Sequence, residues 1–99
     1  MARFDVYRWR GQDQLLLDCQ ADGLSHLTTR FVVPLLDVSD TVLSVERLNP
    51  SFEIAGVRLV MATQLAAAVP VRELGVKVTT VADQDYRIID ALDVLIGTA

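Results

Sequence analysis

The sequence predicts a mainly β-sheet fold that ends in a single α-helix. Short segments with alternating apolar and polar residues fill most of the chain, and glycine, proline and asparagine separate them. An apolar stripe with clear helical spacing lies near the C-terminus. Several strands followed by one amphipathic helix indicate a small antiparallel barrel, or two small sheets, with the helix packed against it.

The first two strands are predicted over residues 4–9 and 14–20, and the polar residues 10–13 form the turn between them. Apolar and polar residues alternate in both segments, which is typical of strands that face a core. Tyr7 and Trp9 lie on the second face of the first strand. Such aromatic residues pack in a second apolar layer or lie in an interface, and we expect the second layer.

A third strand is predicted over residues 30–36, which are rich in β-branched and aromatic residues. Pro34 lacks the N–H that a strand donates to its neighbour, so we expect this strand to lie at an edge there or to carry a bulge. Residues 37–48 are compatible with a short helix or with a strand, and both stay open. Asn49-Pro50 then indicates a turn.

The clearest hairpin joins residues 52–54 to residues 57–61 through the Ala55-Gly56 turn. Alternation continues across the turn, which is typical of two paired strands that share one buried face.

The next segment contains an alanine run, Ala66-Ala67-Ala68, which favours a turn of helix within residues 63–69. Pro70 limits the length of that turn. Leu74-Gly75 indicates another turn, and Val76-Lys77-Val78 alternates as a short strand.

One α-helix is predicted between an N-cap at Thr80 and a glycine stop at Gly97. Asp83 and Asp85 lie near its start, where the positive end of the helix dipole favours anions. The apolar stripe consists of Ile88, Leu92 and Leu95, widened by Ile89 and Ile96, while the solvent side carries Asp90 and Asp93.

The length and composition indicate one domain over residues 1–99. Apolar residues make up 52% of the chain, charged residues make up 22%, and the mean hydropathy is +0.35, so the chain has enough apolar surface to fold. That much apolar surface is difficult to bury in so short a chain. We therefore expect a homodimer that covers the surplus.

Charge and cysteine content limit the partners and the compartment. The formal net charge of −4 repels a phosphate backbone, so we expect no direct nucleic-acid binding. A single cysteine, Cys19, and the lack of a leader before Phe4 indicate a cytoplasmic protein. No apolar run reaches the ~20 residues of a membrane-spanning helix, so we expect no membrane insertion.

The sequence contains no motif for catalysis, phosphate binding or metal ligation, so we expect no enzyme activity, cofactor or metal. His26, the only histidine, lies in a polar loop and is expected at the surface, and Cys19 alternates as a core residue. The carboxylates of the predicted helix are spread over an exposed face. Four arginines lie near the predicted strand ends: Arg3, Arg8, Arg10 and Arg30. They could gather into a modest basic spot after folding, but we expect their side chains to be solvated at the strand edges.

Several segments, in order along the whole chain, resemble the CcdB family of plasmid and chromosomal toxins. They are Phe4-Asp5-Val6-Tyr7, Leu17-Asp18-Cys19-Gln20-Ala21-Asp22, Val32-Val33-Pro34-Leu35, Leu48-Asn49-Pro50, the block from Met61-Ala62-Thr63 to Ala68-Val69-Pro70-Val71, and the helix through Ile88, Ala91 and Leu92. None of these segments is a catalytic signature. The resemblance depends on their order and spacing.

The resemblance implies an SH3-like barrel of antiparallel strands with a small extra sheet and a C-terminal helix, the CcdB/MazF-like fold, assembled as a homodimer. Family members are toxins of type II toxin–antitoxin systems. The dimer binds the A subunit of DNA gyrase and favours the cleaved-DNA state, and a CcdA-like antitoxin is its natural partner.

By the same resemblance, gyrase would be bound by the C-terminal residues Leu95, Ile96, Gly97, Thr98 and Ala99. The family typically ends in Trp-Gly-Ile, whereas this chain has no tryptophan there, and the aromatic position falls on Ile96 or Gly97. We therefore expect weak or absent gyrase poisoning. The antitoxin is expected at the first hairpin loop, where the match to the family is poor, at Arg8, Arg10, Gln12 and Asp13.

Two other functions stay open. A CcdB-fold decoy would still bind the antitoxin but would have lost gyrase poisoning. An RNA-cleaving MazF-like toxin would share the barrel, but it needs a basic groove and acid–base groups, for which a charge of −4 and one histidine offer little.

Overall fold

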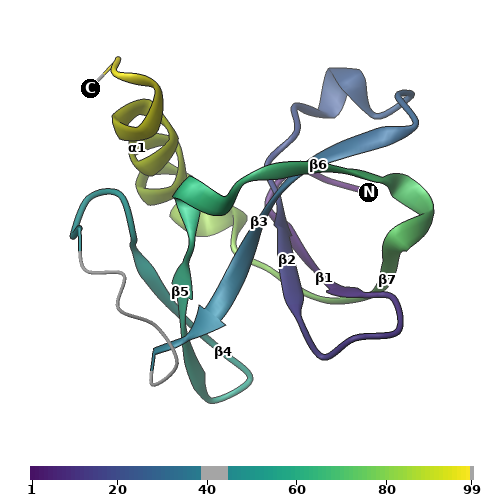
Figure 1. Cartoon of the computed structure of the whole chain (residues 1–99), viewed down its shortest axis with the longest axis horizontal. Helices are drawn as coiled ribbons and strands as arrows, with labels where there is room; N and C mark the ends of the chain where they lie inside the picture. Colours follow the sequence, from purple (N-terminus) through teal and green to yellow (C-terminus); the bar gives the residue numbers. More distant parts are fainter. Residues whose placement is uncertain (39–44, 99) are drawn as a thin grey trace.

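The computed structural model describes residues 1–38 and 45–98, which form a curled antiparallel sheet with one α-helix at the C-terminal end (Figure 1). The strands are β1 (Asp5–Trp9), β2 (Leu15–Asp18), β3 (Thr29–Asp37), β4 (Ser51–Ile54), β5 (Val57–Met61), β6 (Ala67–Pro70) and β7 (Leu74–Thr80). The helix is α1 (Asp85–Ile96), and single 3₁₀ turns lie at Asp22–Leu24, Thr63–Leu65, Val71–Glu73 and Ala82–Gln84. The predicted mainly β fold with a C-terminal helix is confirmed.

The strands follow the order β4-β5-β3-β2-β1-β7, and β6 also pairs with β3. β3 is central because its residues 29–32 pair with β6 and its residues 35–37 pair with β5 on the same side. Pro34 lies between these two stretches, and its carbonyl accepts a hydrogen bond from the Ala62 N–H at 2.9 Å. β3 as a whole is not an edge strand, but on the side that faces β5 and β6 no described strand is paired with it at Pro34, so the missing N–H falls where β3 changes partner.

Both predicted hairpins are confirmed. β1 and β2 are antiparallel with Val6 opposite Leu17, and β4 and β5 are antiparallel with Ile54 opposite Val57. In the second turn Ala55 has φ +53° and Gly56 has φ +80°. A two-residue hairpin turn needs these positive φ values to match the twist of the strands it joins.

Two segments differ from the sequence prediction because strand pairing overrides local propensity. A single 3₁₀ turn does form within the predicted residues 63–69, but at Thr63–Leu65; Ala67 and Ala68 of the alanine run enter β6, where Ala68 lies opposite Phe31 of β3. Leu74-Gly75 is the start of β7 instead of a turn. A Cβ on Gly75 would lie 2.9 Å from the carbonyl oxygen of Arg8, so a glycine permits β7 to approach β1 this closely.

The predicted segment of residues 37–48 is described only in part. Asp37 ends β3, residues 46–48 form a turn, and residues 39–44 lie outside the described residues. The choice between helix and strand for this segment stays open. Asn49 is buried and donates to the carbonyl of Met61 at 3.0 Å, which anchors the predicted Asn49-Pro50 turn.

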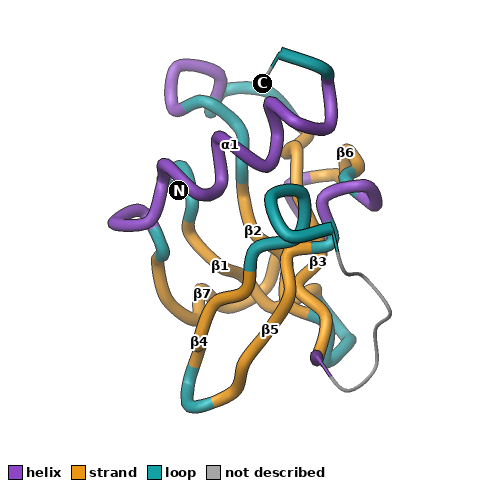
Figure 2. Tube along the Cα trace, turned by 90° about the vertical axis from the view of Figure 1, so that its left-hand side faces the viewer, coloured by secondary structure: helices purple, strands orange, loops and turns teal. Residues whose placement is uncertain are grey.

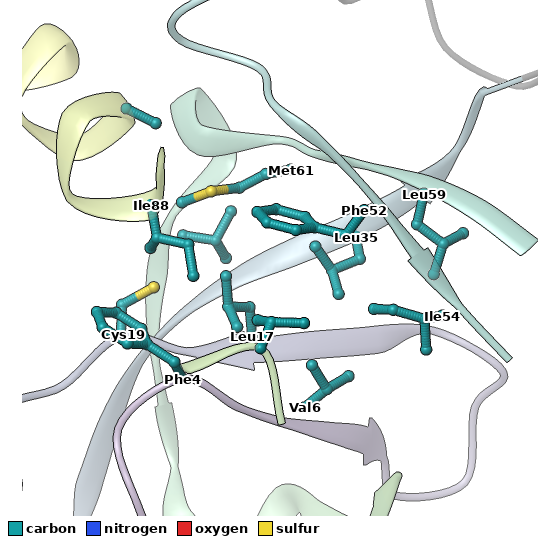
Figure 3. Packing of buried hydrophobic residues seen from close by; sticks show 13 residues of the cluster. Phe4, Val6, Leu17, Cys19, Leu35, Phe52, Ile54, Leu59, Met61 and Ile88 are labelled. Carbon is teal, nitrogen blue, oxygen red and sulfur yellow. The ribbon is translucent and has the colours of Figure 1, made fainter. Parts of the chain in front are cut away.

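Apolar side chains pack on both faces of the sheet. The larger cluster lies between the sheet, the β4–β5 hairpin and α1, and Figure 3 shows Ile88 of α1 near one end of it and Leu59 and Ile54 near the other. The smaller cluster lies inside the curl formed by β6, β3, β2, β1 and β7 and contains Tyr7, Leu16, Val32, Val69 and Leu74, with Trp9 packed against it. The predicted second layer for Tyr7 and Trp9 is confirmed.

The helix begins later than its predicted cap. Thr80 Oγ1 accepts the N–H of Ala82 at 3.3 Å, at the start of the preceding 3₁₀ turn whose N-cap is Val81, while α1 itself starts at Asp85. Gly97 ends the helix in the left-handed conformation, at φ +82°, as predicted. In the described part of the chain, no helix is long and apolar enough to cross a membrane.

The faces of α1 only partly follow the prediction. Ile88 and Ala91 are buried, whereas Leu95 and Ile96 are 40% and 70% exposed, so the apolar stripe stops short of the last turn. Asp90 is not simply solvated. Its carboxylate accepts two hydrogen bonds from Arg47, at 2.6 and 3.1 Å, and this pairing lowers the pKa of Asp90 below its usual value.

Candidate functional site

The C-terminal tip, residues 95–98, is an exposed surface at the end of α1. Ile96 presents most of its side chain to solvent, and the Thr98 N–H donates to the carbonyl of Asp93 at 2.9 Å, which folds the chain back behind Gly97. Ala99, the last residue of the predicted gyrase site, lies outside the described residues. The tip is apolar but small, and it offers no aromatic side chain.

The four residues predicted to bind an antitoxin lie at the β1–β2 hairpin: Arg8 is near the end of β1, and Arg10, Gln12 and Asp13 lie in the loop that follows. The Arg8 guanidinium lies 3.7 Å from the Asp13 carboxylate, and both side chains are exposed, as is Gln12. Arg10 is engaged within the protein, since it donates to the carbonyls of Arg72 at 2.8 Å and Leu74 at 3.2 Å. The loop is therefore tied to the start of β7, while Arg8, Gln12 and Asp13 are available to a partner.

A cleft beside this loop has no counterpart in the sequence analysis. Its volume is about 470 Å³, its apolar walls include Leu15, Leu35, Ile54, Leu59 and Val78, and Arg8, Asp13 and Asp37 also line it. These residues come from six strands and one loop. No local pattern marks such a cleft, because it exists only once the two hairpins stand side by side.

The four arginines do not gather into a basic spot. Arg30 is fully buried and donates through Nε, at 3.1 Å, and through Nη2 to Asp18 Oδ2. The other oxygen of Asp18 accepts the N–H of Gln20 at 3.1 Å, while Arg30 Nη1 is buried without a hydrogen-bond partner in the described part. The expected solvated edge is therefore wrong for Arg30, which forms a buried ion pair with a residue of β2.

Cys19 is a buried core residue, as predicted, with a free thiol. Burial, and then the nearby Asp18 carboxylate, raise the pKa of this thiol to about 12. Burial and the Asp5 carboxylate likewise raise the pKa of Tyr7 to about 12. Neither group is activated as a nucleophile.

These two groups predict a loss of stability at alkaline pH. The pKa values rise from 9.0 for the thiol and 10.0 for the phenol in an unperturbed chain to about 12 in the folded protein. The unfolded chain therefore loses these protons first, so the free energy of unfolding is at its full value below pH 9 and falls as the pH rises toward 12. Urea unfolding at a series of pH values measures this decline.

A Cys19→Ala variant is the control for this prediction. Its urea midpoint should stay constant until the pH comes within about one unit of 10.0, the pKa of the Tyr7 phenol in the unfolded chain. If the midpoint of the unsubstituted protein does not change between neutral pH and about pH 11, the buried positions of both groups are contradicted.

The remaining candidate groups stay apart. His26 lies among the exposed residues 21–28 that connect β2 to β3, as expected, and Asp83 and Asp85 are exposed. No group of three or more His, Cys, Asp or Glu side chains among residues 1–38 and 45–98 is placed to hold a metal ion.

Two solved structures with similar folds come from mycobacteria. "Mycobacterium tuberculosis toxin MazF-mt6" has a TM-score of 0.78 and 16% identity, over 98% of this chain and 99% of that chain. "Endoribonuclease in complex with its cognate antitoxin from Mycobacterial species" has a TM-score of 0.82 and 15% identity, over 100% of this chain and 97% of that chain. Identities this low establish the fold alone. This protein therefore has the CcdB/MazF-like fold predicted from its sequence.

The family is shown by a match between the sequence and a family model. Residues 3–97 match the family described as CcdB protein, so the chain belongs to the CcdB family of toxins. A comparison with curated proteins finds no match.

Proposed function

We propose that this chain is the toxin of a type II toxin–antitoxin system and that it acts by binding the A subunit of DNA gyrase. The observation that carries the proposal is the family match over residues 3–97. Exposed apolar side chains on the sheet and at the end of α1, such as Phe31 and Ile96, support it, because such side chains suit protein binding. The action is one of binding, since the target enzyme itself makes the DNA break.

The C-terminal tip would contact gyrase weakly. Gly97 is the left-handed residue that ends α1, which is the place a glycine of Trp-Gly-Ile would take, so Ile96 would stand at the aromatic position. An isoleucine buries less area than a tryptophan at the centre of an interface. Weak or absent poisoning follows, and a chain without any poisoning would be a decoy that still occupies the antitoxin.

The toxin would be a cytoplasmic homodimer. Exposed apolar side chains support the dimer: Phe31 and Ala68 face each other across the β3–β6 ladder, and Leu65 lies just before β6. Sedimentation equilibrium should give twice the 10.9 kDa of one chain.

The antitoxin would bind at the β1–β2 loop, through Arg8, Gln12 and Asp13, with Arg10 holding the loop in place.

The proposal is tested with purified protein and with gyrase from the source organism. We expect inhibition of supercoiling only at high protein concentration, with few cleaved gyrase–DNA complexes. Strong accumulation of cleaved complexes would contradict the weak tip. No binding to the A subunit at any concentration would refute gyrase as the target.

RNA cleavage is a second candidate function, favoured by the structural similarity to an endoribonuclease. The cleft beside the β1–β2 loop could admit a nucleotide, but the one cationic side chain among the described residues that line it, Arg8, forms an ion pair with Asp13. His26 does not line the cleft. Cleavage of RNA by the purified protein, abolished by Arg8→Ala, would establish this function in place of gyrase binding.

A further inference from the structure

The cleft exposes one end of the larger apolar cluster. Three of its walls, Leu35, Ile54 and Leu59, belong to that cluster, and Leu15 and Val78 pack against it. α1 covers the opposite end, as Figure 2 shows by placing the helix and the tip of the β4–β5 hairpin at opposite ends of the molecule. Leu35, Ile54 and Leu59 are themselves buried, so the apolar surface that α1 does not reach is formed by Leu15 and Val78, which are partly exposed, and by Val57, which is 45% exposed.

The cleft also lies between the two end strands of the sheet. β4 contributes Ile54 and β7 contributes Val78, and these strands stand first and last in the strand order. Within the described residues, β4 pairs only with β5, and β7 pairs only with β1. In this described part of the chain, each end strand therefore leaves one edge without a paired strand, at which an added extended chain can form backbone hydrogen bonds.

The charged side chains around the cleft determine which kind of peptide it would bind. Two carboxylates, of Asp13 and Asp37, and one guanidinium, of Arg8, belong to exposed residues that line it. This arrangement carries a net negative charge, which favours a segment with Lys or Arg beside its apolar side chains. The volume of about 470 Å³ suits a few aliphatic side chains.

We propose that this cleft docks an extended peptide segment that inserts aliphatic side chains between β4 and β7 and carries Lys or Arg next to them. The inference rests on the proposed function, in which the segment belongs to the antitoxin. It extends the antitoxin surface from the β1–β2 loop onto the β4–β5 hairpin.

The test uses two synthetic peptides that alternate leucine with lysine or leucine with glutamate, each with terminal prolines that prevent self-assembly. Binding to the isotope-labelled protein is followed by NMR. The lysine peptide should shift the amides of Ile54, Val57 and Val78 and bind about tenfold more tightly than the glutamate peptide. Shifts confined to another surface, or equal affinity for the two peptides, would overturn the proposal.

Variants separate the cleft from the rest of the surface. Val57→Glu, on a wall that is 45% exposed, should weaken the lysine peptide about tenfold, while Val45→Glu, at a residue that is 54% exposed and outside the cleft, should not. Asp13→Lys should reverse the preference in favour of the glutamate peptide. An unchanged affinity in Val57→Glu would refute the cleft as the docking site.

The result of the peptide-binding test does not depend on whether the protein binds gyrase. A protein that binds the lysine peptide in the cleft but neither binds gyrase nor stops growth would keep the cleft assignment and refute the proposed toxin. A protein that stops growth through gyrase but has no preference between the peptides would refute the cleft assignment alone.

Discussion

Replacing Arg30 by methionine is expected to lower the free energy of unfolding by about 3–5 kcal/mol. Arg30 and Asp18 are both fully buried, and the guanidinium is the partner of Asp18 Oδ2. Without it, the carboxylate stays in the apolar interior with its charge uncompensated. A loss of this size is a large share of the 5–15 kcal/mol typical of a small domain, so urea unfolding measures it readily.

The double variant Asp18→Leu, Arg30→Met is the matched control. Removing both charges should restore most of the lost stability, because a buried ion pair contributes little once an apolar pair of similar volume replaces it. Arg30 Nη1 adds to this expectation, since it has no hydrogen-bond partner among the described residues. A cost below about 1 kcal/mol for Arg30→Met alone would show that water reaches the pair.

Replacing Ile96 by tryptophan is expected to tighten binding to the gyrase A subunit about 30- to 1000-fold, or about 2–4 kcal/mol. Ile96 is 70% exposed at the last helical position, so a larger ring has space and disturbs no packing. Titration calorimetry measures the affinity, and the yield of cleaved gyrase–DNA complex should rise with it.

Gly97→Trp serves as the comparison. At φ +82° a tryptophan is strained, so this variant should bind more weakly than Ile96→Trp and should fray the end of α1. Equal gains from the two variants would contradict Ile96 as the anchor position. No gain from either variant would refute contact between this tip and gyrase.

The hairpins could be predicted because their signals are local. A two-residue turn at Ala55-Gly56 and period-two alternation on either side suffice to define β4 and β5. The end of the helix was equally accessible, because Gly97 is both a glycine and the left-handed residue that stops α1.

The alanine run and Arg30 could not be placed in this way. Ala67 and Ala68 favour helix by propensity, yet they pair with Val32 and Phe31, which lie far away in the sequence. Arg30 is charged and flanked by polar residues on one side, which suggests a solvated edge. Its buried partner Asp18 becomes a neighbour only when β2 and β3 pair.

Two of the candidate surfaces could be predicted from the sequence, and the third could not. The β1–β2 loop and the C-terminal tip are single stretches of chain, so a resemblance in sequence could nominate them, and their binding roles stay predictions. The cleft combines Leu15, Leu35, Ile54 and Val78 from separate strands. Only the strand order brings these residues together.

The position of Pro34 in the middle of β3 has a consequence for how the protein unfolds. One uninterrupted strand pairs with β6 in its first half and with β5 in its second half, so neither half of the sheet can detach without disrupting the backbone that holds the other. We expect the amides of this strand to exchange with deuterium only when the whole chain opens. A protease would then find its cleavage sites in β3 only in the fully unfolded molecule.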